Sequence, residues 1–138
     1  ATPAGNSTMA LVLQRLGLLL DRQPWREMAA QMLLSMKTTV ERYPLSFERW
    51  ALAMMHETHP YLEVAIVGEN AFEKALAIQS RFLPNMVLEA GTDGRESSPL
   101  LAGKSGASDA YIYICRNYAC RKPVQTLEDF YQMVRTET

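Results

Sequence analysis

The chain has 138 residues, of which 48% are hydrophobic, and a formal net charge of −1. This length and composition suffice for one domain, or for two small ones that share a core. The near-neutral charge argues against a nucleic-acid partner. The hydrophobic runs, such as residues 16–20, are far shorter than the roughly 20 residues of a membrane span, so we expect no membrane partner. Two cysteines are too few for a disulfide scaffold and no signal peptide is recognisable, so we expect a cytoplasmic protein.

Helical patterns occupy residues 1–60. The first begins at Asn6 and Ser7, two good N-cap residues. Helical spacing predicts that it buries Met9, Val12, Leu13, Leu16, Leu19 and Leu20. The second begins near Pro24 and ends at Pro44, with a predicted core stripe of Trp25, Met28, Ala29, Met32, Met36, Val40 and Tyr43.

A third helical pattern has Ser46 as its predicted cap and ends at Pro60. Its predicted inward side chains are Phe47, Trp50, Ala51, Met54 and Met55. Short connections make the three helices antiparallel neighbours. The methionines in this half favour a core stripe, although a peptide-binding groove, or a surface that packs against further helices, also fits them.

Beyond Pro60 the pattern changes to strands. Residues 63–67 form a short hydrophobic run closed by a glycine, and the Asn70-x-x-Glu73 spacing predicts a capping box that opens a helix to about Arg81. Residues 86–90 predict a second strand, so the segment is expected to be a βαβ unit with parallel strands.

Two further elements complete this half. Residues 111–115 predict a third strand, and the Thr126-x-x-Asp129 spacing predicts a capped final helix. The predicted fold class is therefore mixed α and β. Helical hairpins in residues 1–60 precede a small three-stranded βαββα unit in residues 61–138.

Cys115 and Cys120 lie at the end of the third strand and in the following turn. Their Cα atoms could reach disulfide distance if the turn folds back. The neighbouring cations, Arg116, Arg121 and Lys122, would favour a reactive thiolate. However, the C-x-x-C spacing of thioredoxin-type centres is absent, and a cysteine at a strand end usually packs as a small hydrophobic residue.

Two other site patterns fail on spacing or context. His56 and His59 are closer together than zinc-site histidines usually are, so we expect no metal site and place both histidines at a helix terminus. Residues 98–105 end in Gly-Lys-Ser but lack the first glycine of a phosphate-binding loop and lead into a strand. We therefore expect no bound cofactor.

Three segments carry a family resemblance: residues 3–7 (PAGNS), 81–85 (RFLPN) and 110–123 (AYIYICRNYACRKP). Together they are similar to the C-terminal end of the thioredoxin-domain-containing proteins related to spermatogenesis-associated, thioredoxin-like proteins. The resemblance implies a parent with a thioredoxin-like module followed by an (α/α)6 toroid of the sugar-epimerase and glycosidase type. It assigns no reaction, and the redox motif of the upstream module does not carry over to Cys115 or Cys120.

Two functional hypotheses follow. In the first, the chain is a non-catalytic structural portion of a larger, sugar-processing-like protein, and its partner is the upstream part of its own parent chain. Asn6 and Ser7 would then lie nearest the toroid's pocket, unless they only cap a helix; exposed helical surface could also drive homo-oligomerisation. In the second, the chain is an independent module that binds a small anion or undergoes thiol redox chemistry at residues 115–122, beyond the strand ends.

Overall fold

The computed structural model describes residues 4–94, 98–117 and 119–135. These residues form five helices and a four-stranded sheet, which confirms the mixed α/β fold class. The chain divides into two compact units, one extending to Tyr61 and the other beginning at Leu62. In the described part of the chain, none of the helices is long and apolar enough to cross a membrane.

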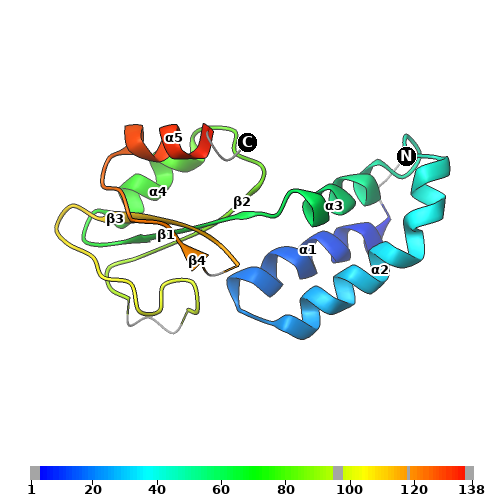
Figure 1. The fold of residues 1–138 in the computed structure, drawn as a ribbon, viewed down its shortest axis with the longest axis horizontal. Helices are drawn as coiled ribbons and strands as arrows, with labels where there is room; N and C mark the ends of the chain where they lie inside the picture. Colours follow the sequence, from blue (N-terminus) through cyan, green and yellow to red (C-terminus); the bar gives the residue numbers. More distant parts are fainter. Residues whose placement is uncertain (1–3, 95–97, 118, 136–138) are drawn as a thin grey trace. The chain divides into compact units, whose positions relative to one another are not determined.

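The first unit contains three helices, α1 (Gly5–Leu19), α2 (Gln23–Arg42) and α3 (Glu48–Thr58), shown in Figure 1. Pro24 lies in the first turn of α2, as predicted, where its missing N–H costs nothing. Phe47, rather than Ser46, occupies the N-cap position of α3, and it makes no side-chain capping bond. The core of this unit is formed by Ala10, Leu11, Leu33, Val40, Trp50 and Ala53.

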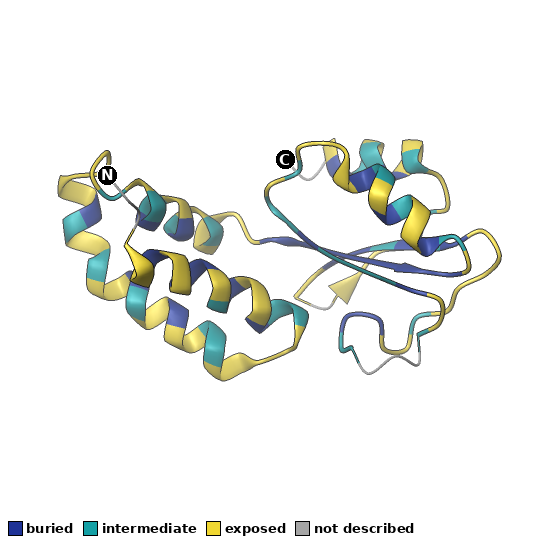
Figure 2. Ribbon diagram, turned by 180° about the vertical axis from the view of Figure 1, so that it is seen from behind, coloured by how far each residue is buried: buried dark blue, intermediate teal, exposed yellow. Residues whose placement is uncertain are grey.

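Helix α1 buries a different face from the one its hydrophobic pattern predicts. Its buried residues are Ser7, Ala10, Leu11, Gln14 and Gly17. The predicted stripe lies roughly on the other side of the helix, given about 100° of rotation per residue. We call its most exposed members the α1 stripe: Met9, Val12, Leu16 and Leu20, with 51%, 39%, 38% and 44% of their surfaces exposed. The helices in Figure 2 accordingly show exposed surface along much of their length.

Small residues explain why α1 packs through this other face. A Cβ at Gly17 would lie 2.7 Å from Cγ of Arg26, so glycine allows α1 and α2 to approach closely. Ala10 and Ala29 are fully buried. Gln14 ties α1 to α3, since its side-chain amide donates to the Ala53 carbonyl at 3.0 Å and to Glu57 Oε1 at 2.7 Å.

The predicted core stripes of α2 and α3 are only partly right. Met32, Met36 and Met54 pack against the core. Met28 and Met55, by contrast, are 52% and 57% exposed. A stripe chosen by hydrophobicity is therefore too wide for helices that contact only two neighbours.

The second unit is built on the sheet β2-β1-β3-β4. Its strands are β1 (Leu62–Val67), β2 (Met86–Gly91), β3 (Tyr111–Arg116) and β4 (Ala119–Cys120). Strands β1 and β2 are parallel, as predicted, with α4 (Ala71–Gln79) between them in the chain. Strand β3 is antiparallel to both β1 and β4. The sequence analysis expected three strands, and β4 is the additional one.

Helices α4 and α5 (Leu127–Arg135) cover one face of the sheet (Figure 1). Val64 and Ile66 of β1 pack there with Ile112, Ile78 and Phe130, all nearly or completely buried. The Thr126 half of the predicted capping box of α5 forms, because the Asp129 amide donates to the Thr126 hydroxyl oxygen at 3.1 Å. The Thr126 hydroxyl in turn donates to the Asp129 carboxylate at 2.6 Å.

The segment 98–107 packs against the sheet. Leu100 and Leu101 are buried in it, and the Tyr113 hydroxyl donates to the Ser105 carbonyl at 2.8 Å. Gly68 permits this close approach: its φ is +143°, and a Cβ there would lie 2.4 Å from the Ala107 carbonyl oxygen. Residues 63, 65 and 67 of β1, which alternate with those facing the helices, are therefore buried as well.

Candidate functional site

Cys115 and Cys120 form a disulfide at the edge of the sheet. They face each other directly across the β3–β4 pair, with Cα atoms 3.9 Å apart. The turn thus folds back, and the cysteines do not pack as two separate small hydrophobic side chains. Closing so short a loop stabilises the fold by about 2 kcal/mol on the chain-entropy account. A disulfide that closed a longer loop would stabilise the fold more on the same account.

The two cysteine residues differ in burial. Cys115 is 1% exposed, whereas Cys120 is an exposed residue on the edge strand. Arg116, Arg121 and Lys122, which the sequence analysis singled out, are exposed residues beside them. Tyr118, between the two cysteines in the sequence, lies outside the described residues.

Glu63 is a functional candidate that the sequence analysis missed. It lies opposite Cys115 in the β1–β3 pair and is only 1% exposed. Its Oε1 accepts a hydrogen bond of 2.8 Å from the backbone amide of Asn117, whose φ of +48° belongs to the turn between the cysteines. The available signal was a lone carboxylate beside the otherwise hydrophobic run 64–67.

The strand ends do not gather as the ligand-binding hypothesis required. The carboxyl ends of β1 and β2 lie at the same edge because these strands are parallel. Strand β3 is antiparallel to β1, so its carboxyl end and residues 116–122 lie at the opposite end of the sheet. Residues 115–122 therefore do not share an edge with the carboxyl ends of β1 and β2, which is the arrangement that ligand-binding open sheets of parallel strands have.

A polar network occupies the end of β1 where the sequence predicted only a helix cap. Asn70 makes no side-chain bond to the first turn of α4. Its Oδ1 accepts from the Ala110 amide at 2.7 Å, and its Nδ2 donates to Asp109 Oδ1 at 3.1 Å. Lys74 reaches the same carboxylate at 2.5 Å. The hydrogen bond from Lys74, followed by the one from Asn70, lowers the pKa of Asp109. Asn70 therefore joins the helix start to β3.

Asn6 and Ser7 do not cap α1. The helix begins at Gly5, Ala4 is the N-cap residue, and no side chain bonds to the first turn. Ser7 is 1% exposed, and its hydroxyl donates to the Ala4 carbonyl at 2.7 Å, while Asn6 is exposed. Both residues lie one to two positions inside the helix, because the chain becomes helical before the predicted cap.

The two histidines of the sequence analysis lie near the end of α3. The ring of His56 stacks on that of Tyr61 with centroids 4.0 Å apart, and His59 Nδ1 lies 2.9 Å from the Thr58 hydroxyl. Among the residues the structure describes, no three His, Cys, Asp or Glu side chains gather as metal ligands. Cys115 and Cys120 are joined to each other, and disulfide sulfurs are not the thiolates that bind zinc.

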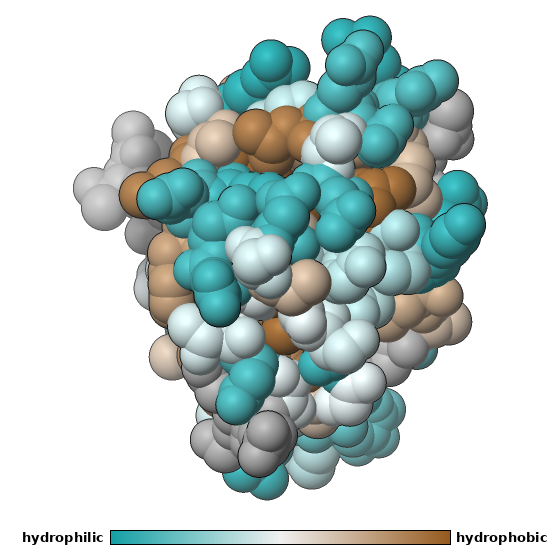
Figure 3. Space-filling model, turned by 90° about the vertical axis from the view of Figure 1, so that its left-hand side faces the viewer, coloured by the Kyte–Doolittle hydropathy of each residue, from teal (hydrophilic) through white to brown (hydrophobic). Residues whose placement is uncertain are grey.

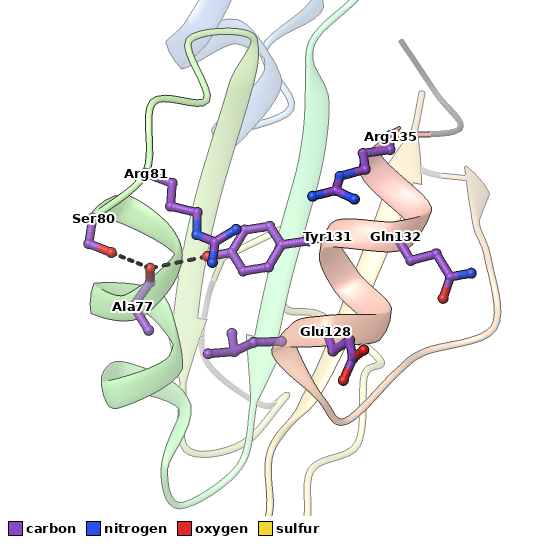
Figure 4. A pocket seen from close by; sticks show the side chains of 8 residues that line it. Ala77, Ser80, Arg81, Glu128, Tyr131, Gln132 and Arg135 are labelled. Carbon is purple, nitrogen blue, oxygen red and sulfur yellow. Dashed lines mark hydrogen bonds between the residues drawn. The ribbon is translucent and has the colours of Figure 1, made fainter.

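A cleft of about 750 Å³ lies between α4 and α5. In Figure 4 the guanidinium of Arg81 lies against the ring of Tyr131, at 4.0 Å from its centroid, and Arg135 reaches toward the same ring. The Tyr131 hydroxyl donates to the Ala77 carbonyl at 3.2 Å. Glu128 adds a negative charge to the lining. Arg81 thus packs as a cation on an aromatic ring, and the cleft has no uniform charge.

Exposed hydrophobic side chains are concentrated in the helical unit. Beyond Leu62, large exposed hydrophobic residues in the described chain are confined to Phe72, Leu76 and Phe82. Figure 3 shows the side of the molecule at the left of Figure 1, where hydrophilic side chains predominate and hydrophobic ones are scattered. The larger candidate surface is therefore the α1 stripe together with its neighbours on α2 and α3.

Comparisons of the chain with family models, with curated proteins and with solved structures found no match.

Proposed function

We propose that this chain is a non-catalytic structural portion of a larger helical protein, and that the α1 stripe docks against helices of that protein. The observation that carries the proposal is the reversed orientation of α1. A helix in a self-sufficient bundle turns its hydrophobic face inward. Here Met9, Val12 and Leu16 remain exposed, while Ser7 and Gln14 are buried.

The extent of the exposed surface supports a helical partner. The stripe follows spacings of three and four residues over about three turns, from Met9 in α1 to Leu20 at its C-cap, which is the pattern of a helix-packing ridge. Leu34 on α2 and Leu52 on α3 are also exposed, at 73% and 47%. Isolated exposed leucines are normal, whereas a continuous row along one helix indicates an interaction surface.

The kind of parent protein is part of the proposal. The resemblance of residues 3–7, 81–85 and 110–123 implies an (α/α)6 toroid of the sugar-processing type, in which helices pack side by side around a ring. The upstream portion of such a parent chain would supply the helices that cover the α1 stripe. The competing hypothesis is that a second copy of this chain covers the same stripe in a homo-oligomer.

The test is the substitution Leu16→Lys, made both in the isolated chain and in the full-length natural protein. Lysine keeps a long aliphatic stem but brings a charge, so it is tolerated at a surface and disruptive in a helix interface. We expect Leu16→Lys to lower the melting temperature of the full-length protein far more than that of the isolated chain.

Leu45 provides the matched control, because it is 93% exposed and lies in the turn between α2 and α3. Leu45→Lys should leave both melting temperatures unchanged. Equal effects of Leu16→Lys in the two contexts would contradict the proposal. If the isolated chain instead forms a stable dimer that Leu16→Lys dissociates, the homo-oligomer is the occupant.

A further inference from the structure

A row of three residues crosses the sheet at the disulfide. Glu63 on β1 is the partner of Cys115 on β3, and Cys115 is the partner of Cys120 on β4. Directly opposed residues on neighbouring strands project from the same face, with Cβ atoms about 5 Å apart. The buried Glu63 therefore lies beside the buried Cys115, and the exposed Cys120 lies beyond it.

Burial decides which sulfur a nucleophile can reach. Thiol–disulfide exchange requires a thiolate to approach one sulfur, while the other sulfur leaves with the electron pair. Cys115 is 1% exposed and lies between β1 and β4, whereas Cys120 is exposed on the edge strand. Attack at Cys120 Sγ with Cys115 as the leaving group is thus the accessible direction.

Glu63 is the acidic residue opposite Cys115, and its carboxylate would oppose the departure of Cys115 as a thiolate, whereas the exposed neighbouring cations would favour it. The backbone amide of Asn117 donates to Glu63 Oε1 at 2.8 Å, and Glu63 interacts electrostatically with Lys104. Arg116, next to Cys115 in β3, is an exposed residue. A carboxylate in this buried position repels a second negative charge on Cys115 Sγ, because solvent screens the pair poorly.

We propose that the Cys115–Cys120 disulfide is a thiol-exchange site for dithiol reductants, entered at Cys120, and that Glu63 slows the release of Cys115. This function is independent of helix docking by the α1 stripe. Reduction of the disulfide would remove the covalent link between β3 and β4, which pair through residues 119 and 120 in the described part of the chain.

The reaction balances as a two-electron exchange. One thiolate of the dithiol attacks Cys120 Sγ, the bond between the two cysteines breaks, and its electron pair passes to Cys115 Sγ, which then takes a proton from water. The second thiol of the reductant loses its proton and attacks the mixed disulfide. Cys120 leaves as a thiolate and is protonated, so the protein is reduced to two thiols and the reductant is oxidised to its disulfide.

The first experiment maps the attacked sulfur in the unaltered protein. The folded chain is treated with glutathione, quenched with acid, alkylated and analysed by peptide mass spectrometry. We expect glutathione on Cys120 and the alkyl group on Cys115. Glutathione chiefly on Cys115, or a disulfide that dithiothreitol reduces only after denaturation, would overturn the exchange site.

The second experiment isolates the charge of Glu63. Glu63→Gln keeps an oxygen that can accept the Asn117 amide but removes the charge, so dithiothreitol should reduce the variant about tenfold faster at pH 7. Glu89→Gln is the matched control, since Glu89 is on β2, two strands away from the disulfide in the sheet, and should change the rate less than twofold. Equal reduction rates for both variants would refute the role of Glu63. Which sulfur is attacked is tested separately, by the first experiment. Circular dichroism of each variant verifies the fold.

Discussion

The reversed orientation of α1 makes an unusual prediction about two positions on the same helix. Ala10 is fully buried, whereas Leu16 is 38% exposed. We compare the substitution Ala10→Lys with Leu16→Lys in the isolated chain. Sequence pattern alone would predict that the leucine is the sensitive position, and the structure predicts the opposite.

The magnitudes follow from burial. Ala10 belongs to the core cluster with Trp50, so a lysine there must bury a charge and displace neighbours, which costs more than about 4 kcal/mol. Leu16→Lys exchanges one good helix former for another, and the aliphatic stem of lysine retains part of the lost contact. We expect it to cost less than about 1 kcal/mol, against a typical domain stability of about 5 kcal/mol or more.

Urea unfolding followed by tryptophan fluorescence measures this difference. Trp25 and Trp50 both lie in the helical unit, and Trp50 is 6% exposed, so the signal reports on that unit. With a slope of about 1 kcal/mol per molar urea, Leu16→Lys should lower the midpoint by less than about 1 M, and Ala10→Lys should lower it by about 4 M or more. If Leu16→Lys unfolds the chain while Ala10→Lys is tolerated, α1 packs through its hydrophobic stripe and the reasoning fails.

Three further predictions concern the α/β unit. The pKa of Asp109 is lowered in the fold, so the ionised carboxylate stabilises the fold above the unfolded pKa near 3.9, and this stabilisation is lost as pH falls through the folded pKa. Acid titration followed by circular dichroism should show this loss of stability, and the loss should be smaller in Lys74→Met. Asn70→Ser keeps a good capping residue but removes the acceptor of the Ala110 amide, so thermal unfolding should show a loss of about 1–3 kcal/mol rather than no change. Gly68→Ala should lower the free energy of unfolding in urea by more than about 2 kcal/mol, because Gly68 has a positive φ and a backbone carbonyl lies close to it. A loss below about 0.5 kcal/mol, which is typical of a surface substitution, would contradict the packing of the segment 98–107.

The elements of the sheet could be predicted because their signals are local. The hydrophobic run of β1 is completely buried, and the helix between β1 and β2 dictates a parallel crossover. Strand β4 could not be predicted, since its two residues pair only after the turn at Asn117 brings Cys120 opposite Cys115. The direction of β3 also depends on long-range pairing that no local pattern specifies.

The errors at single residues share a physical cause. The capping rule predicted a local bond for Asn70, but its side chain bonds to Ala110, 40 positions away in the sequence. The periodicity rule assumed that the most hydrophobic face of α1 is the buried one. Close helix packing through Ala10 and Gly17 reversed that choice, because small residues let backbones approach. Glu63 was missed since a charged residue in a buried strand is rare.

Oxidation of Met9 tests most directly whether the α1 stripe is a docking surface. The side chain is 51% exposed in this chain, so hydrogen peroxide should oxidise it at a rate close to that in the urea-unfolded chain. Mass spectrometry of the full-length natural protein, treated in the same way, should show Met9 oxidised at least about tenfold more slowly if other helices cover the stripe. Equal oxidation rates in the isolated chain and in the full-length protein would contradict the proposal.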